Sequence, residues 1–369
     1  MQSPILDIRM LHHTGIGVYL QGLLEGMAQI EDAPKFLFYG PIEFRPEIPE
    51  RLCDLYFLRN PRIYSIREQV LFPEELRFHP LFHSPHYNIP LRFRGNLVVT
   101  IHDLNHLVFP GNLPSFFHRQ YARFMFGEVA ARAKQIIVIS EHIRSEAQEL
   151  LKIDPDRITL IHYAINPSFG VNLDPEKAGT FRNKHKLPDQ YLLAVGIYKP
   201  HKNYPFLLNA LRDLRKSGEM DIPLVIAGLD QKGLVQLKAL AVEKGVDSFV
   251  NLVGSFSRAE APYLYSSAAA LVFPSLYEGF GLPPLEAMKM NVPVIASNRP
   301  PIPEVAGDAA LFFDPKSPDE FKGALLRLLS DSNLRANLVE KGRANLARFD
   351  WVKTARQTLE VYRKAAEQG

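Results

Sequence analysis

Short, almost wholly apolar runs recur along the chain and alternate with segments of mixed polarity. Examples are residues 97–101, 191–195 and 268–273, where most positions are Val, Leu, Ile, Ala or Phe. A run that is apolar at nearly every position is typical of a strand buried on both faces of a parallel sheet. The segment 204–214 instead places its apolar residues at helical spacing. The repeated order of strand, helix and strand predicts an α/β fold with doubly wound parallel sheets.

Length and composition narrow the class of protein. Two domains are expected, because 369 residues are more than one hydrophobic core usually supports. The chain is 46% hydrophobic and 22% charged, as in ordinary globular proteins. No apolar run approaches the roughly 18 residues of a membrane-spanning helix, and the first residues lack the features of a signal peptide. We therefore expect a cytoplasmic location.

Charge and cysteine content narrow the possible partners and the possible kinds of site. The 43 basic and 40 acidic residues give a formal net charge of +3, too balanced to favour nucleic acid as a partner. The single cysteine, Cys53, excludes an intrachain disulfide framework and a cysteine-based metal cluster.

The stretch 274–286 holds the main candidate site. It follows the apolar run 268–273, contains Gly279 and Gly281, and has a proline pair at 283–284, where a helix is expected to begin. Glycine lets a ligand approach the backbone, and a helix N-terminus offers unpaired N–H groups and partial positive charge to an anion. The usable N–H donors are those of Gly279, Phe280, Gly281, Leu282 and Leu285.

One carboxylate stands on each side of this loop. Glu278 and Glu286 can accept hydrogen bonds from sugar or ribose hydroxyls. The loop and its two carboxylates therefore indicate a site for a phosphorylated sugar. The alternative is a plain strand-to-helix connection with two turn glycines and two solvated glutamates.

The spacing of these two glutamates resembles a known signature. Glu278 and Glu286, with seven residues between them that include Gly-Phe-Gly-Leu-Pro, resemble the E-x7-E motif of family 4 retaining glycosyltransferases. The segments 291–298 and 303–308 are similar to the continuation of that motif, and the resemblance runs nearly end to end. It implies the GT-B fold, in which two Rossmann-like domains face each other across a cleft. It also implies transfer of a hexose from a nucleotide sugar to an acceptor hydroxyl, with retention at the anomeric carbon.

The resemblance also suggests how the chain is divided. We expect an N-terminal domain over residues 1–168 on the acceptor side, a linker over 169–188 and a nucleotide-sugar-binding domain over 189–350. A last helix over 351–367, amphipathic in its own pattern, is expected to cross back onto the first domain.

Near the N-terminus, Gly15 and Gly17 stand between an expected strand and a helix expected from about Val18. This order suggests a dinucleotide-binding turn. However, Leu20 stands where a third glycine belongs, and the following strand ends without an acidic residue. The resemblance implies instead that Gly15 and Gly17 form a loop facing the donor phosphates. A tight turn without a ligand is the alternative.

His102 ends the apolar strand 97–102. The carboxyl end of a parallel strand is where binding residues are expected in an open α/β sheet. The resemblance implies that His102 lies beside the transferred sugar. The alternative is a histidine with a purely structural role.

Lys202 follows the strand 191–196 and its terminal Gly196. The resemblance implies that Lys202 binds the donor diphosphate and that Gly196 starts the loop carrying it. Ile197 departs from the pattern, since many members have arginine there, so Lys199 or a helix N-terminus has to supply the missing charge. The alternative is an ordinary surface lysine.

We expect catalysis without a metal ion or other cofactor, with Lys202 and the loop N–H groups stabilising the departing diphosphate and with His102 and Glu278 at the sugar. Asp154-x-Asp156 looks like the metal motif of another glycosyltransferase class, but it stands where the resemblance to family 4 implies a polar loop on the interdomain side, which argues against that role.

The partners follow from the resemblance to bacterial polysaccharide mannosyltransferases. GDP-mannose is the first expectation for the donor and a UDP-hexose the second. The acceptor is expected to be a glycan or a lipid-linked glycan, which leaves open a peripheral contact with the inner face of the membrane. Alternative functions are a nucleotide-sugar epimerase or phosphorylase of the same fold, a non-catalytic sugar-nucleotide-binding protein and, less favoured, a nicotinamide oxidoreductase.

Overall fold

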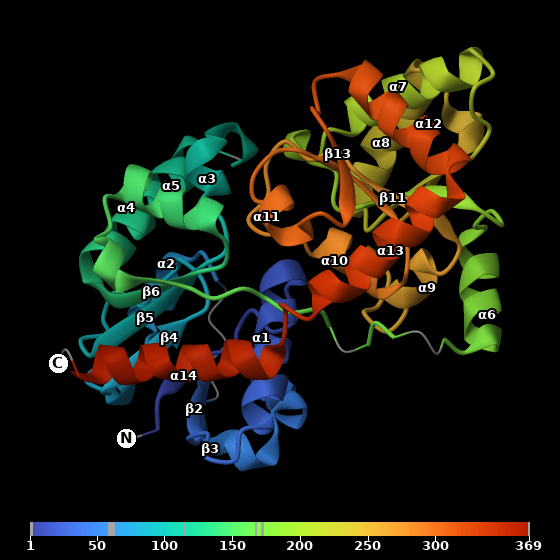
Figure 1. Ribbon diagram of the computed structural model, residues 1–369. Coiled ribbons are helices and arrows are strands. Elements are labelled where there is room, and N and C mark those ends of the chain that lie inside the picture. The colour runs from blue at the N-terminus through green and yellow to red at the C-terminus, as the bar shows by residue number, and fades with distance from the viewer. Residues whose placement is uncertain (1–2, 58–62, 114, 167, 171–172, 368–369) are drawn as a thin grey trace. The chain divides into compact units, whose positions relative to one another are not determined.

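The computed structural model describes residues 3–57, 63–113, 115–166, 168–170 and 173–367. The chain forms two compact units (Figure 1). Unit 1 contains residues 1–166 and 349–369, and unit 2 contains residues 167–348. The segment expected as a linker, 169–188, carries the helix α6 (Pro175–His185) and belongs to unit 2.

Unit 1 is built on a parallel sheet of seven strands in the order β3-β2-β1-β4-β5-β6-β7. Its inner strands are almost wholly buried and most of their residues are apolar, although His83, Ser84 and Thr100 are buried polar exceptions. The strands are β1 (Ile5–Asp7), β2 (Phe36–Tyr39), β3 (Cys53–Phe57), β4 (Leu81–Ser84), β5 (Asn96–Ile101), β6 (Ala133–Val138) and β7 (Ile158–Leu160). The strand order reverses between β1 and β4.

The helices of unit 1 are α1 (Thr14–Ala28), α2 (Ile66–Val70), α3 (Asn105–Val108), α4 (Phe116–Arg132), α5 (Glu141–Leu151) and α14 (Trp351–Glu367). The last helix packs along α1 and against β4, β5 and β6, and Figure 1 shows it in red beside α1. None of the described helices is long and apolar enough to cross a membrane.

Two local expectations for unit 1 are wrong. The helix α1 begins at Thr14 and not near Val18, because the Gly17 N–H already donates to the His13 carbonyl at 2.9 Å. Gly15 and Gly17 therefore lie in the first turn of a helix and not in a loop. The strand β3 was not expected, because it is an edge strand whose Asp54 and Leu55 are exposed, so no apolar run marks it.

Unit 2 contains a parallel sheet of six strands in the order β10-β9-β8-β11-β12-β13. The strands are β8 (Tyr191–Val195), β9 (Leu224–Ala227), β10 (Val250–Val253), β11 (Ala268–Phe273), β12 (Val294–Ser297) and β13 (Ala310–Phe313). Besides α6, the helices are α7 (Tyr204–Lys216), α8 (Gln231–Glu243), α9 (Ala261–Tyr265), α10 (Leu282–Lys289), α11 (Ile302–Ala306), α12 (Pro318–Ser330) and α13 (Ser332–Leu346). The strand order reverses between β8 and β11, the point at which open α/β sheets usually bind ligands.

Candidate functional site

The two loops predicted from sequence to bind the donor leave the two strands at the switch point of unit 2. The loop of Lys202 follows β8, and the loop of Glu278 follows β11, its hydrogen-bonded neighbour. The Leu276 N–H donates to the His201 carbonyl at 2.7 Å and ties the two loops together. Residues separated by more than seventy positions in the chain therefore share one edge of the sheet.

Lys202 and Glu278 form an ion pair at this edge. The Lys202 Nζ donates to the Glu278 Oε1 at 2.7 Å, and the two side chains are only 13% and 14% exposed. The ammonium also lies 5.4 Å from the centroid of the Phe273 ring. Glu278 thus pairs with the lysine that the family resemblance implies for phosphate binding. An anionic ligand of Lys202 has to compete with Glu278.

Gly196 makes room for the lysine. Its backbone has φ +141°, and a Cβ placed there would lie 3.1 Å from Lys202 Cε and 3.4 Å from Nζ. The Tyr204 hydroxyl donates to the Gly196 carbonyl at 2.9 Å and fixes the turn. Both the backbone conformation and the packing therefore favour glycine at this position.

Gly281 begins α10 with φ +109°, which is also a conformation that favours glycine. It is the N-cap residue, so the N–H of Leu282 lies at the positive end of the helix. Gly279 and Phe280 precede it in the same turn, with the Phe280 ring buried. The predicted donors therefore gather at one helix N-terminus, and Pro283 has no N–H to contribute.

Glu286 lies one turn into α10 and is held by a tyrosine that the sequence did not single out. The Tyr265 hydroxyl, at the end of α9, donates to Glu286 Oε2 at 2.6 Å. Burial raises the pKa of Glu286 to about 7, although the hydrogen bond from Tyr265 opposes this. At neutral pH this carboxyl is therefore divided between its protonated and ionised forms.

In unit 1, His102 directly follows β5 and its ring is fixed. Because a carbonyl only accepts, His102 Nε2 must carry the proton that it donates to the Pro85 carbonyl. The ring packs against Tyr19 and Tyr163, with centroids 5.2 and 5.6 Å away. Burial lowers the pKa of His102 to about 4, so the imidazole is neutral at pH 7.

A buried ionic network between the end of β1 and α2 was not predicted by the sequence analysis. Arg9 lies between Asp7 and Glu68, with N···O distances of 2.5 and 2.6 Å, and all three side chains are at most 3% exposed. The Glu68 carboxylate also accepts from the Asn88 side chain at 2.5 Å. Glu68 lies 59 residues from Arg9 in the sequence, so no local pattern predicts that the two side chains pair in the folded protein.

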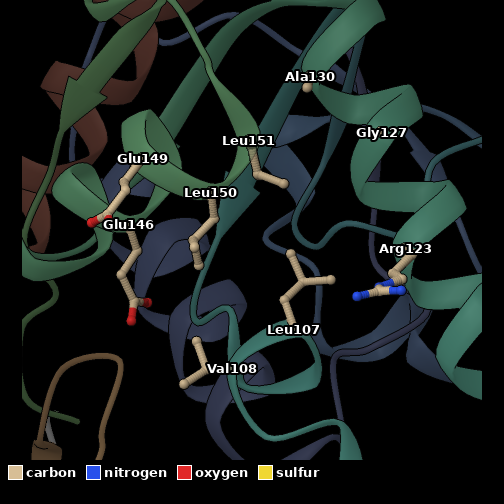
Figure 2. A pocket seen from close by; sticks show the side chains of 9 residues that line it. All are labelled: Leu107, Val108, Arg123, Gly127, Ala130, Glu146, Glu149, Leu150 and Leu151. Carbon is tan, nitrogen blue, oxygen red and sulfur yellow. The ribbon is translucent and has the colours of Figure 1, made fainter.

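Unit 1 also contains a cavity of about 600 Å³ between α3, α4 and α5. Its lining is largely apolar, and Figure 2 shows Arg123 on one side and Glu146 and Glu149 on the other. None of the residues predicted for the site lines it. Asp154, part of the rejected metal motif, accepts from the Asp156 N–H and caps a short 3-10 helix.

Comparison with known proteins identifies the family of both parts of the chain. The family described as "Glycosyltransferase Family 4" matches residues 15–169, and "Glycosyl transferases group 1" matches residues 177–345. The O-antigen chain mannosyltransferase B of Escherichia coli is 31% identical over 375 residues, covering 95% of this chain and 96% of that protein.

Solved structures confirm the fold. Sucrose-phosphate synthase from Thermosynechococcus elongatus superposes with a TM-score of 0.76 at 20% identity, covering 100% of both chains. Anabaena HepE in complex with UDP-glucose superposes with a TM-score of 0.74 at 15% identity, covering 98% of this chain and 99% of that one. The two Rossmann-like units are those of the GT-B fold. From the family matches and the nearly full-length similarity, we conclude that this chain belongs to the family 4 glycosyltransferases.

Proposed function

We propose that this glycosyltransferase moves mannose from GDP-mannose to a hydroxyl of a growing polysaccharide or lipid-linked glycan, with retention of configuration. Support for mannose comes from the name of the E. coli relative, an O-antigen chain mannosyltransferase. Support for a nucleotide-sugar donor comes from the UDP-glucose complex of HepE, and a UDP-hexose is the second choice.

The Lys202–Glu278 pair beside the N-terminus of α10 is the observation that carries this proposal. A donor diphosphate arriving there would take Lys202 from Glu278 and use the N–H groups of the glycine loop. Glu278, released from the lysine, would accept from a hydroxyl of the sugar. One exchange of partners would thus bind both ends of the bond to be broken.

The proposed chemistry is a same-face displacement. The bond between the anomeric carbon and the phosphate oxygen breaks, the acceptor oxygen bonds to that carbon, and the acceptor proton passes to the departing phosphate. Lys202 and the loop N–H groups stabilise the charge that develops on the diphosphate. Neutral His102 is too weak a base for this proton and instead orients the sugar.

The test is incubation of the purified protein with GDP-mannose or a UDP-hexose, with and without a glycan acceptor. We expect a glycoside with the anomeric configuration of the donor, determined by NMR, and undiminished turnover in EDTA. Isomerised donor without transfer would favour an epimerase, and binding without any turnover would favour a non-catalytic protein. Lost turnover in EDTA, restored by manganese or magnesium, would contradict metal independence.

We also propose that α4 contacts a membrane surface that carries a lipid-linked acceptor. Phe116, Phe117 and Phe124 are 63%, 80% and 52% exposed, and Arg119 and Arg123 are exposed on the same helix. Aromatic rings with interleaved cations suit an anionic bilayer surface.

We expect the protein to cosediment with vesicles that contain anionic lipid. The double substitution Phe116→Ser with Phe117→Ser should weaken this binding, and so should high salt. Equal binding to neutral vesicles would contradict the electrostatic part.

A further inference from the structure

His86 and His102 end two neighbouring strands of unit 1. His86 follows β4 by two residues, and His102 directly follows β5, which pairs with β4 in parallel. Strand β4 is also one of the two strands at the reversal of strand order, with Arg9 following the other, β1. Both imidazoles therefore lie at the edge of the sheet where a ligand is expected.

The hydrogen bonds of the two imidazoles determine which of their other ring nitrogens carries a proton and which does not. The Asn88 N–H donates to Nδ1 of His86 at 2.9 Å, so the neutral ring of His86 carries its proton on Nε2. His102 is the reverse, since its Nε2–H donates to the Pro85 carbonyl and its Nδ1 keeps a lone pair. One free nitrogen is a donor and the other is an acceptor.

Both free nitrogens are buried without a partner. Among the described residues, neither Nε2 of His86 nor Nδ1 of His102 has a hydrogen-bond partner, and the whole His86 residue is only 3% exposed. An unpaired buried polar atom destabilises the folded state. Such atoms in neighbouring rings suggest that something binds between them.

The two histidines meet at the same segment of the chain. His102 bonds to the carbonyl of Pro85, the residue directly before His86. The pKa of His86 is lowered well below its ordinary value, first by burial and then by the nearby Arg9, His102 and His13. A ligand that reaches both free nitrogens must accept from one and donate to the other, which a hydroxyl or two adjacent hydroxyls can do.

A rigid network holds His86 in its tautomer. The residue whose N–H fixes the ring, Asn88, is itself held by Glu68 at 2.5 Å and by the Tyr121 hydroxyl. Glu68 is in turn paired with Arg9. The buried Asp7–Arg9–Glu68 triplet, which no step of the proposed reaction uses, thus positions a binding group.

The charge of this network selects a neutral ligand. Arg9 contributes one positive charge, and the carboxylates of Asp7 and Glu68 that pair with it offset that charge. Both imidazoles are neutral at pH 7. A phosphate or carboxylate would meet no net positive charge here, whereas a hydroxyl can accept from one ring and donate to the other.

We infer that His86 Nε2–H and His102 Nδ1 together recognise one hydroxyl, or two adjacent hydroxyls, of the sugar being transferred. This inference rests on the proposed function, because it takes His102 to face that sugar. His86 is then a determinant of donor specificity. Tyr64, 44% exposed, lies with its ring centroid 5.8 Å from that of His86 and links this group to the surface.

The test compares GDP-mannose with its 2-, 3-, 4- and 6-deoxy analogues as donors for the wild type, His86→Phe and His86→Gln. The wild type should lose at least about tenfold in kcat/KM on one deoxy donor, because the buried polar atoms are then left unpaired. His86→Phe should lower kcat/KM on GDP-mannose by a similar factor and abolish the penalty for that same deoxy donor. His86→Gln keeps an N–H donor and should retain part of the discrimination.

Three controls separate the outcomes. His79→Phe, a half-buried histidine before β4, should keep the full deoxy penalty. GDP affinity measured by calorimetry should not change in His86→Phe, and the fluorescence of Trp351 reports whether unit 1 is folded. An equal loss on all donors, or activity within twofold of the wild type on all of them, overturns the inference.

Failure of the proposed function gives results that differ from failure of the His86 inference. If the wild type turns over a UDP-hexose but not GDP-mannose, the donor assignment is wrong, and the deoxy series is repeated on that hexose. If the wild type turns over no donor, the proposed function fails. Calorimetry of the intact nucleotide sugars against wild type and His86→Phe then decides the His86 inference by the same loss of discrimination.

Discussion

At the scale of single residues, the ion pair between Lys202 and Glu278 sets how tightly a diphosphate binds. The carboxylate occupies the ammonium at 2.7 Å, so every anionic ligand has to displace it. Glu278→Gln removes this competition but also removes the proposed acceptor for a sugar hydroxyl. We therefore expect the affinity for a nucleoside diphosphate to rise by about three- to tenfold, or about 0.7–1.4 kcal/mol, while turnover falls.

Calorimetry of the diphosphate and an assay of turnover check both halves of this prediction. Lys202→Met is the matched control, since it removes the cation and should weaken diphosphate binding. If Glu278→Gln binds diphosphate more weakly than the wild type, the carboxylate does not compete with the ligand.

Glu286 should make nucleotide binding depend on pH. Burial raises its pKa to about 7, and the ionised form is the one that can accept from two ribose hydroxyls while Tyr265 donates to it. With that pKa, the ionised fraction falls about tenfold between pH 8 and pH 6. The affinity for a nucleoside diphosphate should therefore fall by up to about tenfold over this range.

The β-phosphate also titrates near pH 6, so the comparison with Glu286→Gln is essential. That variant should bind more weakly at pH 8 and show only the dependence that the phosphate contributes. A wild-type profile identical in shape to that of Glu286→Gln would remove Glu286 from the nucleotide site.

At the scale of elements, the contact between α1 and α14 depends on two glycines. A Cβ on Gly22 would lie 2.0 Å from Trp351 Cε2, and one on Gly26 would lie 2.2 Å from the Trp351 carbonyl oxygen. The Trp351 indole N–H in turn donates to the Ile165 carbonyl at 2.9 Å. The C-terminal helix can approach α1 this closely only because both side chains are absent.

Gly22→Ala should therefore destabilise unit 1 by more than about 2 kcal/mol, as overpacking does when backbone has to shift. Thermal unfolding followed by the fluorescence of Trp351, the only tryptophan, measures the effect. Gly127→Ala in α4 is the control, because its Cβ meets nothing within 4 Å and alanine should stabilise the helix by up to about 1 kcal/mol. Equal melting temperatures for the two variants would contradict the packing argument.

At the scale of the whole molecule, buried histidines make the fold sensitive to acid. Burial lowers the pKa of His83 to about 3 and of His102 to about 4, and that of His86 also lies well below its ordinary value. The same groups titrate near pH 6.5 in the unfolded chain. Between this pH and their lower pKa values in the folded chain, the unfolded chain therefore binds more protons than the folded chain. Their contribution is complete above about pH 6.5 and is lost as the pH falls towards 4.

We expect the melting temperature reported by Trp351 to fall between pH 7.5 and pH 5.5. Glu68 and Glu286 act in the opposite sense, because burial raises their pKa values, but His201, whose pKa burial lowers to about 4, adds to the effect of the three histidines. His83 bridges the Tyr362 hydroxyl at 2.7 Å and Thr100 at 2.8 Å, so His83→Gln should lower stability at pH 7.5 and reduce the drop on acidification. An unchanged or rising melting temperature at pH 5.5 would refute this account.

The residues of the candidate site divide into those that sequence could predict and those that it could not. Gly281 and Gly196 could be predicted, because each stands in a loop between an apolar strand and a helix, where glycine indicates an unusual backbone conformation. Both residues have positive φ. The spacing of Glu278 and Glu286 pointed to the family. Tyr265 and Asn88 carry no such signal, because a partner that arrives from a distant element leaves no local pattern.

The hydrophobic pattern by itself determined the α/β class and most strands, because a strand buried on both faces is apolar at nearly every position wherever it lies in the sheet. The same pattern did not predict the edge strand β3, which is partly exposed to water. The helix α1 was expected from about Val18 and not from Thr14, because Gly15 and Gly17 suggested a turn.

Tertiary structure alone decided which groups meet and in what state. Strand order brought Lys202 against Glu278, and the burial of Glu286 and His102 moved their pKa values. Hydrogen bonds from Asn88 and to Pro85 fixed opposite tautomers in His86 and His102. Sequence specifies residue types and local periodicity, but charge state and tautomer depend on desolvation and on partners, which exist only once the sheet has assembled.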